Sequence, residues 1–248
     1  MLCISNYILY EIKFLLQLPQ FYDIIYYIHD IRKKGALYMG ALLTRQELIY
    51  LKNRFNARSA KFSKNETVLH IGENENQLCF LLDGTVYLCT ENERCERSIL
   101  RFFRSGEYFT SAMLIRSEYA VSYMTAKYPS EVVFFGREEL FRFCAANPDW
   151  QAKFMEILSE QGSRNACFTD FVLHQRSIRE KLLLFFRQEA DIRNSDRIRL
   201  PLPYTDLAEF LACDRSAMMK ELSKMKSEGI ISGKNREIFM DMSAHTAR

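Results

Sequence analysis

The sequence predicts an α+β fold in which a strand-rich first part is followed by helices. Between about residues 60 and 135, short apolar runs alternate with turn residues, a spacing typical of a β-sandwich or barrel. After Pro148 the apolar residues recur every three or four positions, as they do along one face of a helix. Residues 204–225 then form two short amphipathic patterns joined by a tight turn, which is typical of a helix-turn-helix.

The predicted strands and turns alternate regularly through the first part. The strands are 67–71, 77–82, 85–89, 98–103 and 131–135, and the turns are 72–74, 83–84, 91–93 and 105–106. Asp83 and Gly84 predict a β-hairpin between two of these strands, because glycine readily supplies the positive φ that a tight turn needs.

Three helices are predicted before the helix-turn-helix. Thr44 is followed three residues later by Glu47, a capping-box pattern that predicts a helix over 44–53. A long helix over 148–173 begins with a proline, which suits the first helical position. A shorter amphipathic helix follows over 177–188.

The long helix carries one apolar stripe with a few polar breaks, a pattern that suits a dimer seam. The residues predicted to form that interface are Phe154, Leu158, Gln161, Asn165, Phe168 and Val172. The same stripe would equally serve to pack the helix against the chain's own barrel, so both interpretations stay open on the residues alone.

The helix-turn-helix segment carries the chemistry of a DNA-reading surface. Thr205 is a candidate N-cap for the first helix and Asp214 for the second. Between residues 215 and 226 there are four cations and one anion, and Arg, Lys and Ser side chains can bond base edges or phosphates. Residues 230–240 predict a β-hairpin wing. The candidate DNA-binding residues are Thr205, Arg215, Ser216, Met219, Lys220, Ser223, Lys224, Lys234 and Arg236.

These patterns resemble the Crp/Fnr family of bacterial transcription regulators from about residue 44 to 240. Residues 70–86 resemble the family's glycine-marked hairpins, 105–109 the turn before its ligand pocket, 147–149 the start of its dimerisation helix, and 213–220 its recognition helix. The resemblance implies an antiparallel β-roll (a jelly-roll-like double-stranded β-helix), a long dimerisation helix and a winged helix-turn-helix. The implied domains are an N-terminal extension (1–40), an effector-sensing β-roll (41–146), the dimerisation helix (147–175) and a DNA-binding domain (176–248).

Departures from the family pattern bear on the signal. Members that bind cyclic AMP carry a Gly-Glu pair and an Arg-Ser pair at the pocket, and these positions read here as Ser111-Ala112 and Ala120-Val121. Burying a phosphate without a cation is costly, so cyclic AMP is not the expected effector. The candidate pocket residues are Gly106, Glu107, Phe109, Ser111, Ala112, Arg116, Ala120 and Val121.

Cofactors are not expected. The chain has seven cysteines but no Cys-x-x-Cys pair and no Cys/His cluster with zinc spacing, so we expect free thiols in a cytoplasmic protein. Only Cys3 lies where redox members hold an iron–sulfur cluster, and haem is not expected either. A redox disulfide among Cys79, Cys89 and Cys95 is the alternative to buried, inert thiols.

The first 40 residues have three competing interpretations: an additional packed helix, an interfacial amphipathic helix, or a translated segment upstream of a native start at Met39. The apolar run from Leu15 to Tyr27 is interrupted by Pro19 and Asp23, and it is too short and polar to span a bilayer.

The sequence therefore predicts a homodimeric, sequence-specific DNA-binding regulator controlled by a signal in its β-roll. Its net charge of +3 leaves DNA binding to the local charge of the reading helix. The expected partners are double-stranded DNA, a second copy of the chain and an unidentified small-molecule or redox effector, with RNA polymerase as a further candidate. The alternative is a ligand-binding or interaction module that no longer reads DNA. An enzyme is not expected, because no nucleophile–base pair, metal cluster or phosphate loop is present.

Overall fold

The structure is a computed structural model of the chain. It describes residues 42–72, 76–114, 116–117, 119–168, 172–193 and 195–240. Within these ranges, only the backbone is described at 166–167. These residues all fall in the unit Met39–Arg248. The N-terminal extension of the sequence prediction lies outside the described residues.

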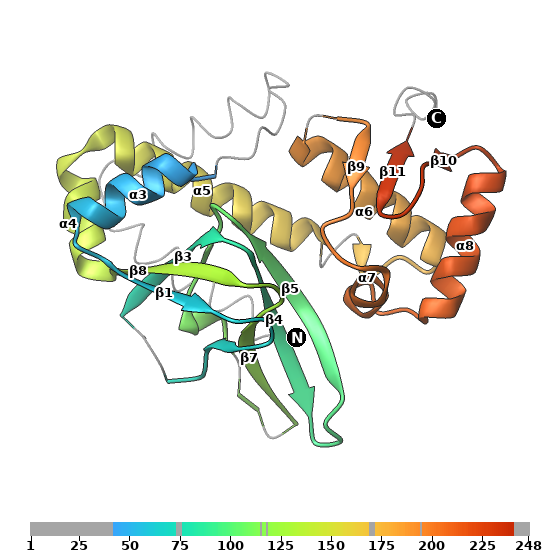
Figure 1. Cartoon of the computed structure of the whole chain (residues 1–248), viewed down its shortest axis with the longest axis horizontal. Coiled ribbons are helices and arrows are strands. Elements are labelled where there is room, and N and C mark those ends of the chain that lie inside the picture. Colours follow the sequence, from blue (N-terminus) through green and yellow to red (C-terminus); the bar gives the residue numbers. More distant parts are fainter. Residues whose placement is uncertain are drawn as a thin grey trace. The chain divides into compact units, whose positions relative to one another are not determined.

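The strand-rich part forms two four-stranded antiparallel sheets that enclose a common core (Figure 1). The strands are β1 (Arg58–Phe62), β2 (Thr67–Leu69), β3 (Gln77–Asp83), β4 (Thr85–Asn92), β5 (Arg97–Arg104), β6 (Tyr108–Phe109), β7 (Ala120–Ala126) and β8 (Ser130–Gly136). One sheet has the order β1-β8-β3-β6 and the other β2-β7-β4-β5. Their inner faces meet in buried apolar side chains such as Leu81, Leu88, Phe103 and Phe109. The α+β class and the antiparallel β-roll are thus confirmed.

The Asp83–Gly84 turn does not make the predicted hairpin. Strand β3 belongs to one sheet and β4 to the other, so the turn carries the chain between the two layers. Gly84 adopts φ +99°, and a Cβ there would lie 2.2 Å from the Ser130 hydroxyl oxygen. Glycine is therefore required by crowding at a sheet crossing. The hairpin lies one step later, where β4 pairs with β5.

Three helices cover the outer face of the β1-β8-β3-β6 sheet (Figure 1). They are α3 (Arg45–Arg54), α4 (Arg137–Ala146) and the first part of α5 (Pro148–Cys167). The predicted capping box is present, because Thr44 and Glu47 bond each other's backbone N–H. Leu48, Leu51, Phe154 and other apolar residues then pack on β3 and β8. Helix α4 and strands β1, β6 and β7 were not among the predicted elements.

Helix α5 is shorter than predicted, ending at Cys167 instead of near Leu173. Phe168 closes it with a backbone N–H that bonds the carbonyls of Arg164 and Asn165. The Phe168 ring stacks on Phe210 of the C-terminal part, with ring centroids 4.0 Å apart. The apolar stripe of α5 therefore joins the β-roll to the C-terminal part of the same chain.

The C-terminal part is a three-helix unit with a small sheet. Its elements are α6 (Ile178–Arg193), β9 (Arg197–Arg199), α7 (Tyr204–Phe210), α8 (Arg215–Ser227), β10 (Ile231–Ser232) and β11 (Glu237–Met240). The sheet order is β10-β11-β9, so β9 is an edge strand. Strands β10 and β11 form the predicted wing hairpin. Helix α6 runs five residues past the predicted end at Gln188, because Glu189 and Ala190 are buried against neighbouring elements.

The two halves of the described chain share one apolar core. Tyr87, Cys89 and Ile99 of the β-roll belong to the same buried cluster as the α6–α8 side chains. Cys79 and Cys89 are buried free thiols, and burial raises their pKa values to about 12 and about 11. Both thiols therefore stay protonated and unreactive at neutral pH.

We predict that Gly84→Ala lowers the free energy of unfolding by about 1–3 kcal/mol, because alanine meets both a positive φ and the Ser130 side chain. Gly229→Ala is the matched control, since Gly229 also has a positive φ (+73°) but a Cβ there would meet nothing within 4 Å. The control should lose only about 1 kcal/mol, from the left-handed backbone alone. Urea unfolding of both variants makes the comparison, and equal stabilities would contradict the crowded crossing.

Candidate nucleic-acid interface

Helices α7 and α8 pack together through small and apolar side chains. Leu207, Ala208 and Leu211 of the first helix region are buried, as are Met218 and Leu222 of α8. Ala208 is buried and small enough for close approach of the two helices. The buried stripe of α8, completed by Met225, fixes which face of that helix is left outside.

The turn between the helices is tight and left-handed at Ala212, which has φ +48°. The backbone N–H of Cys213 bonds the carbonyl of Ala208 at 3.0 Å, and the Lys181 ammonium donates to the carbonyl of Leu211 at 2.8 Å. Asp214 then caps α8, because its carboxylate accepts the N–H of Ala217 at 2.7 Å. The Asp214 cap is thus confirmed.

The predicted cap at Thr205 is wrong. Helix α7 begins one residue earlier, at Tyr204, and Pro203 occupies the N-cap position without a side-chain hydrogen bond. Proline already has the extended backbone that an N-cap needs, so the helix starts without a polar side chain. Thr205 is left exposed on the first turn of α7.

The outer face of α8 carries the predicted reading residues side by side. All six candidates on this helix are exposed: Arg215, Ser216, Met219, Lys220, Ser223 and Lys224. Neither Arg215 nor Lys220 forms an ion pair or hydrogen bond with any described residue. The Ser223 hydroxyl donates to the carbonyl of Met219 at 3.0 Å and can turn outward. The helix therefore presents two unpaired cations between small side chains.

The anions near this face are held away from it. Arg179 of α6 bonds both Glu221 and Glu228, the latter at 2.7 Å. This pairing occupies the single carboxylate of α8 and one that follows the helix. Lys224 still lies 4.0 Å from Glu228, but Arg215 and Lys220 keep an unopposed positive charge, which favours a polyanion.

The wing lies beside α8 and ends in a basic tip (Figure 1). Lys234 is exposed and Arg236 is half-buried. The phenol of Tyr204 donates to the carbonyl of Asn235, and Lys226 donates to that of Gly233 at 3.0 Å. These contacts tie the wing to the start of α7 and the end of α8, so the tip and the reading helix form one surface.

The whole unit is fixed to the β-roll by a buried polar contact. Asp206 of α7 accepts the Tyr87 phenol at 2.7 Å and pairs with the Lys127 ammonium at 2.7 Å. Burial and then the bond to Asp206 raise the pKa of Tyr87 above its usual range, so the phenol stays a donor. Nearby, Arg97 holds Glu209 with two hydrogen bonds of 3.2 Å.

The sequence did not predict that Asp206, Tyr87 and Lys127 connect the DNA-binding unit to the β-roll. Asp206 reads as a helix-start residue and Tyr87 as an inward strand position, and neither pattern indicates that the two meet. The nearest signal is a carboxylate in a run of otherwise apolar inward positions, at 206 between Tyr204 and Leu207. A buried carboxylate needs a partner, but the sequence does not name it.

The candidate effector-pocket residues are spread over several environments. Phe109 lies in the β-roll core, Ser111 is buried in a short 3-10 turn (Ser111–Met113), and Val121 is 45% exposed. Gly106 is buried and Ala112 and Ala120 are half-buried, whereas Arg116 is exposed. Among these candidates only Glu107 lines the cavity between β5, α5 and α6, where it lies 3.5 Å from Arg164 of α5.

The candidate dimer-interface residues mostly face the chain's own fold. Phe154 packs on the β-roll, and Gln161 donates to and accepts from the backbone of Tyr108. Phe168 and Val172 belong to the core shared with α6–α8. Leu158 and Asn165 are half-buried. The alternative of packing against the chain's own barrel thus describes this stripe.

Family models match both parts of the fold. The model for the cyclic nucleotide-binding domain matches residues 59–147, and that for the Crp-like helix-turn-helix domain matches residues 180–244. The chain belongs to the Crp/Fnr family of transcription regulators. Its β-roll is the cyclic nucleotide-binding-type domain of that family, and α7–α8 with the wing is its DNA-binding helix-turn-helix.

Relatives of this Crp/Fnr protein are distant but cover most of it. The cAMP-activated global transcriptional regulator CRP of Pasteurella multocida is 22% identical over 186 residues, covering 72% of this chain and 87% of the relative. A CooA mutant from Carboxydothermus hydrogenoformans has a similar structure, with a TM-score of 0.65, 16% identity, and coverage of 83% and 96%. A cyclic nucleotide-binding domain containing protein from Listeria monocytogenes EGD-e has a TM-score of 0.64 and 14% identity, covering 81% of this chain and 99% of that protein. These structural likenesses show the fold.

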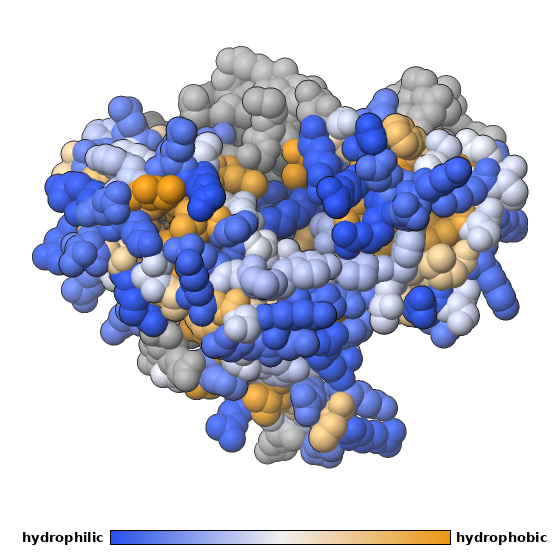
Figure 2. Space-filling model, in the orientation of Figure 1, coloured by the Kyte–Doolittle hydropathy of each residue, from blue (hydrophilic) through white to orange (hydrophobic). Residues whose placement is uncertain are grey.

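Neither a metal site nor a membrane span occurs in the described parts of this Crp/Fnr protein. Groups of three or more potential metal-ligating side chains are absent among the described residues. None of the described helices is long and apolar enough to cross a membrane. Figure 2 shows apolar side chains in separate patches, interrupted by hydrophilic ones, on the face in view.

We predict that Ala212→Gly raises the free energy of unfolding by about 1 kcal/mol, because glycine adopts the left-handed backbone of this turn without strain. Ala145→Gly in α4 is the control, where the same change should lower that free energy by about 0.5–1 kcal/mol. Chemical unfolding measures both, and a loss of stability at residue 212 would contradict the strained turn.

Proposed function

We propose that this protein acts as a homodimer that binds specific DNA sequences and responds to a signal sensed by its β-roll. The observation that carries the proposal is the exposed face of α8, where Arg215 and Lys220 stand unpaired beside the basic tip of the wing. A helix of this kind enters the major groove, where arginine and lysine bond guanine edges and neighbouring cations bond phosphates.

Cyclic AMP held in the family manner does not fit this chain. The relatives named above include a cAMP-activated regulator, but residues 111–112 and 120–121 offer neither a carboxylate for a ribose nor a cation for a phosphate. Arg116 is exposed and pairs through its backbone with Val121 at the sheet edge. The signal is therefore a different small molecule or a redox change.

The dimer contact belongs to the outward face of α5. Its inward stripe is occupied by the chain's own core, which leaves Ala152, Glu156, Ser159 and Ser163 on one face at helical spacing, beside the exposed Gly162. Small side chains along such a face let two helices approach closely. A second copy of α5 is the partner that this face suits.

The test of DNA binding is a gel shift on the promoter region of the protein's own gene, at several salt concentrations. We predict that Arg215→Ala and Lys220→Ala each weaken specific binding by roughly 1–3 kcal/mol if they bond bases. Lys224→Ala should weaken binding to all sequences. It should also reduce by about 1 the slope of the logarithm of the binding constant against the logarithm of the salt concentration. Arg142→Ala, an exposed cation on α4, is the control and should bind like the wild type.

Absence of specific retardation at any salt concentration would contradict DNA reading and favour a ligand-binding module instead. Wild-type affinity and specificity in both Arg215→Ala and Lys220→Ala would remove these residues from the interface.

The test of the dimer uses Gly162→Arg. The described surroundings have room for a side chain at this position, so the monomer should fold normally. Two arginines facing each other across a close helix pair would instead separate the subunits by steric overlap and like charge. Light scattering should show a dimer for the wild type and for the control Ala145→Arg on α4, and a monomer for Gly162→Arg. A Gly162→Arg dimer as stable as the control would contradict an α5 seam.

A further inference from the structure

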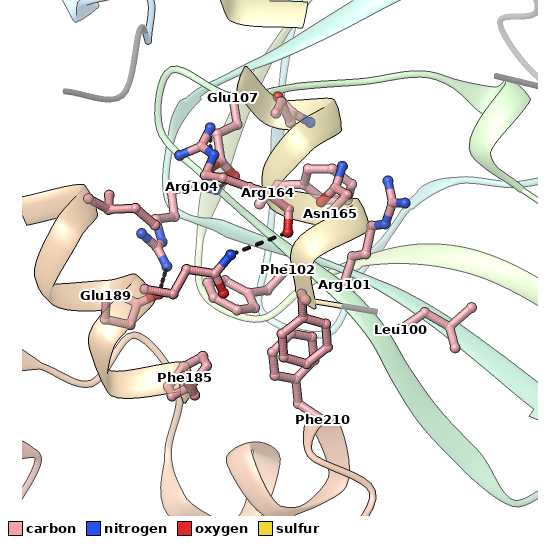
Figure 3. Close-up of a pocket in the computed structure, with 15 residues that line it drawn as sticks. Leu100, Arg101, Phe102, Arg104, Glu107, Arg164, Asn165, Phe185, Glu189 and Phe210 are labelled. Carbon is pink, nitrogen blue, oxygen red and sulfur yellow. Dashed lines mark hydrogen bonds and ion pairs between the residues drawn. The ribbon is translucent and has the colours of Figure 1, made fainter. Parts of the chain in front are cut away.

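A cavity of about 60 Å³ lies where the β-roll meets the C-terminal unit. Strand β5, the end of α5 and helix α6 form its walls, and Figure 3 shows charged groups at one side and phenylalanine rings at the other. At roughly 10–15 Å³ per water molecule, this volume holds about four to six waters. A space of this size suits an ion of about five heavy atoms.

The charged lining has more cations than anions. Arg104 pairs with Glu189, and Arg164 lies 3.5 Å from Glu107. Arg101 has neither a hydrogen bond nor an ion pair with any residue that the structure describes. Its burial lowers the pKa of its guanidinium, which is the response of a cation that lacks a counter-charge. One positive charge of the lining is thus uncompensated.

Several donors of this lining are also unused. Both terminal nitrogens of Arg164 and the Nε of Arg104 are buried without a hydrogen-bond partner among the described residues. Arg164 keeps its ion pair with Glu107, but the contact is not a hydrogen bond. Buried guanidinium donors are costly to leave unbonded, so three of them around one cavity indicate a missing acceptor.

One acceptor of the lining is unused as well. The Oε2 atom of Glu189 is buried without a hydrogen bond, although Arg104 bonds the other oxygen of this carboxylate and Arg193 lies 3.9 Å from Oε2. A carboxylate oxygen repels a fully deprotonated anion but accepts a hydrogen bond from one that keeps a proton. The lining thus combines unused donors with one acceptor.

We propose that this cavity binds phosphate as its singly charged, doubly protonated ion, whose charge matches the one uncompensated cation. Its unprotonated oxygens take the free guanidinium donors, and one of its protons bonds Glu189. The donors come from both β5 and α5, and Glu189 comes from α6, so a bound ion would contact the β-roll and the DNA-binding unit together. This site is separate from the reading helix, and the proposal stands whether or not the protein is shown to read DNA.

Isothermal titration of the full chain with inorganic phosphate, without DNA and at constant ionic strength, tests the site. The wild type should bind saturably with one ion per chain, and sulfate should bind about tenfold more weakly because it has no proton at neutral pH. Arg164→Met should weaken phosphate binding about tenfold or more by removing two donors.

Arg101→Met is the second variant, because it removes no hydrogen bond or ion pair within the described chain. It should weaken phosphate binding and also raise the melting temperature measured without phosphate. The control is Arg142→Met on α4, which removes an exposed arginine elsewhere and should bind like the wild type.

Three results would overturn the proposal. No saturable heat with the wild type means that the cavity holds only water. Equal affinity of the wild type, Arg101→Met and Arg164→Met places the ion elsewhere, and if Arg164→Met fails to fold, Arg101→Met decides. Equal affinity for sulfate and phosphate contradicts the role given to Glu189.

Discussion

The buried carboxylate of Asp206 holds the DNA-binding unit to the β-roll. It lies in the first turn of α7, bonded to the Tyr87 phenol and paired with Lys127, and it is 4% exposed. Removing one partner from a buried pair typically costs 3–5 kcal/mol, because the remaining charge is left without compensation. The orientation of α7 on the β-roll therefore depends on this contact, and α8 takes its orientation from α7.

Aromatic residues around Phe210 form an apolar contact between the β-roll and the C-terminal unit. Phe168 stacks on Phe210, while Phe102 of β5 meets it edge-on at 5.2 Å. These rings come from strand β5 of the β-roll, from the residue that ends α5 and from α7. A change in the β-roll or in α5 would thus be felt at α7 through packed rings, since tightly packed interiors transmit displacement instead of absorbing it.

Carboxylates of the C-terminal unit are paired within the fold, so they do not neutralise the cations on the outer face of α8. The carboxylates of the C-terminal unit that face the β-roll, Glu189, Asp206 and Glu209, are each matched by a cation of the roll. Arg179 meanwhile engages Glu221 and Glu228 beside α8. Anions are thereby neutralised within the fold, and the outer face of α8 keeps its positive charge although the whole chain carries only +3.

The sequence by itself determined the elements and surfaces that depend on local patterns. The capping box at Thr44, the Asp214 cap, the wing and the outward face of α8 all follow from neighbouring residues, whose spacing sets caps and amphipathic faces. Only the tertiary structure decided what depends on partners distant in the chain. The Asp83–Gly84 turn looks like a hairpin until β3 and β4 are seen in different sheets.

The stripe of α5 likewise suits a second copy or the chain's own core equally well. Its use in the core is decided by residues elsewhere in the chain, because Phe168 stacks on Phe210 and Phe154 packs edge-on against Phe80 of the β-roll. The Asp206 contact and the arginine-lined cavity are of the same kind, because a buried charge indicates that it needs a partner without identifying which one.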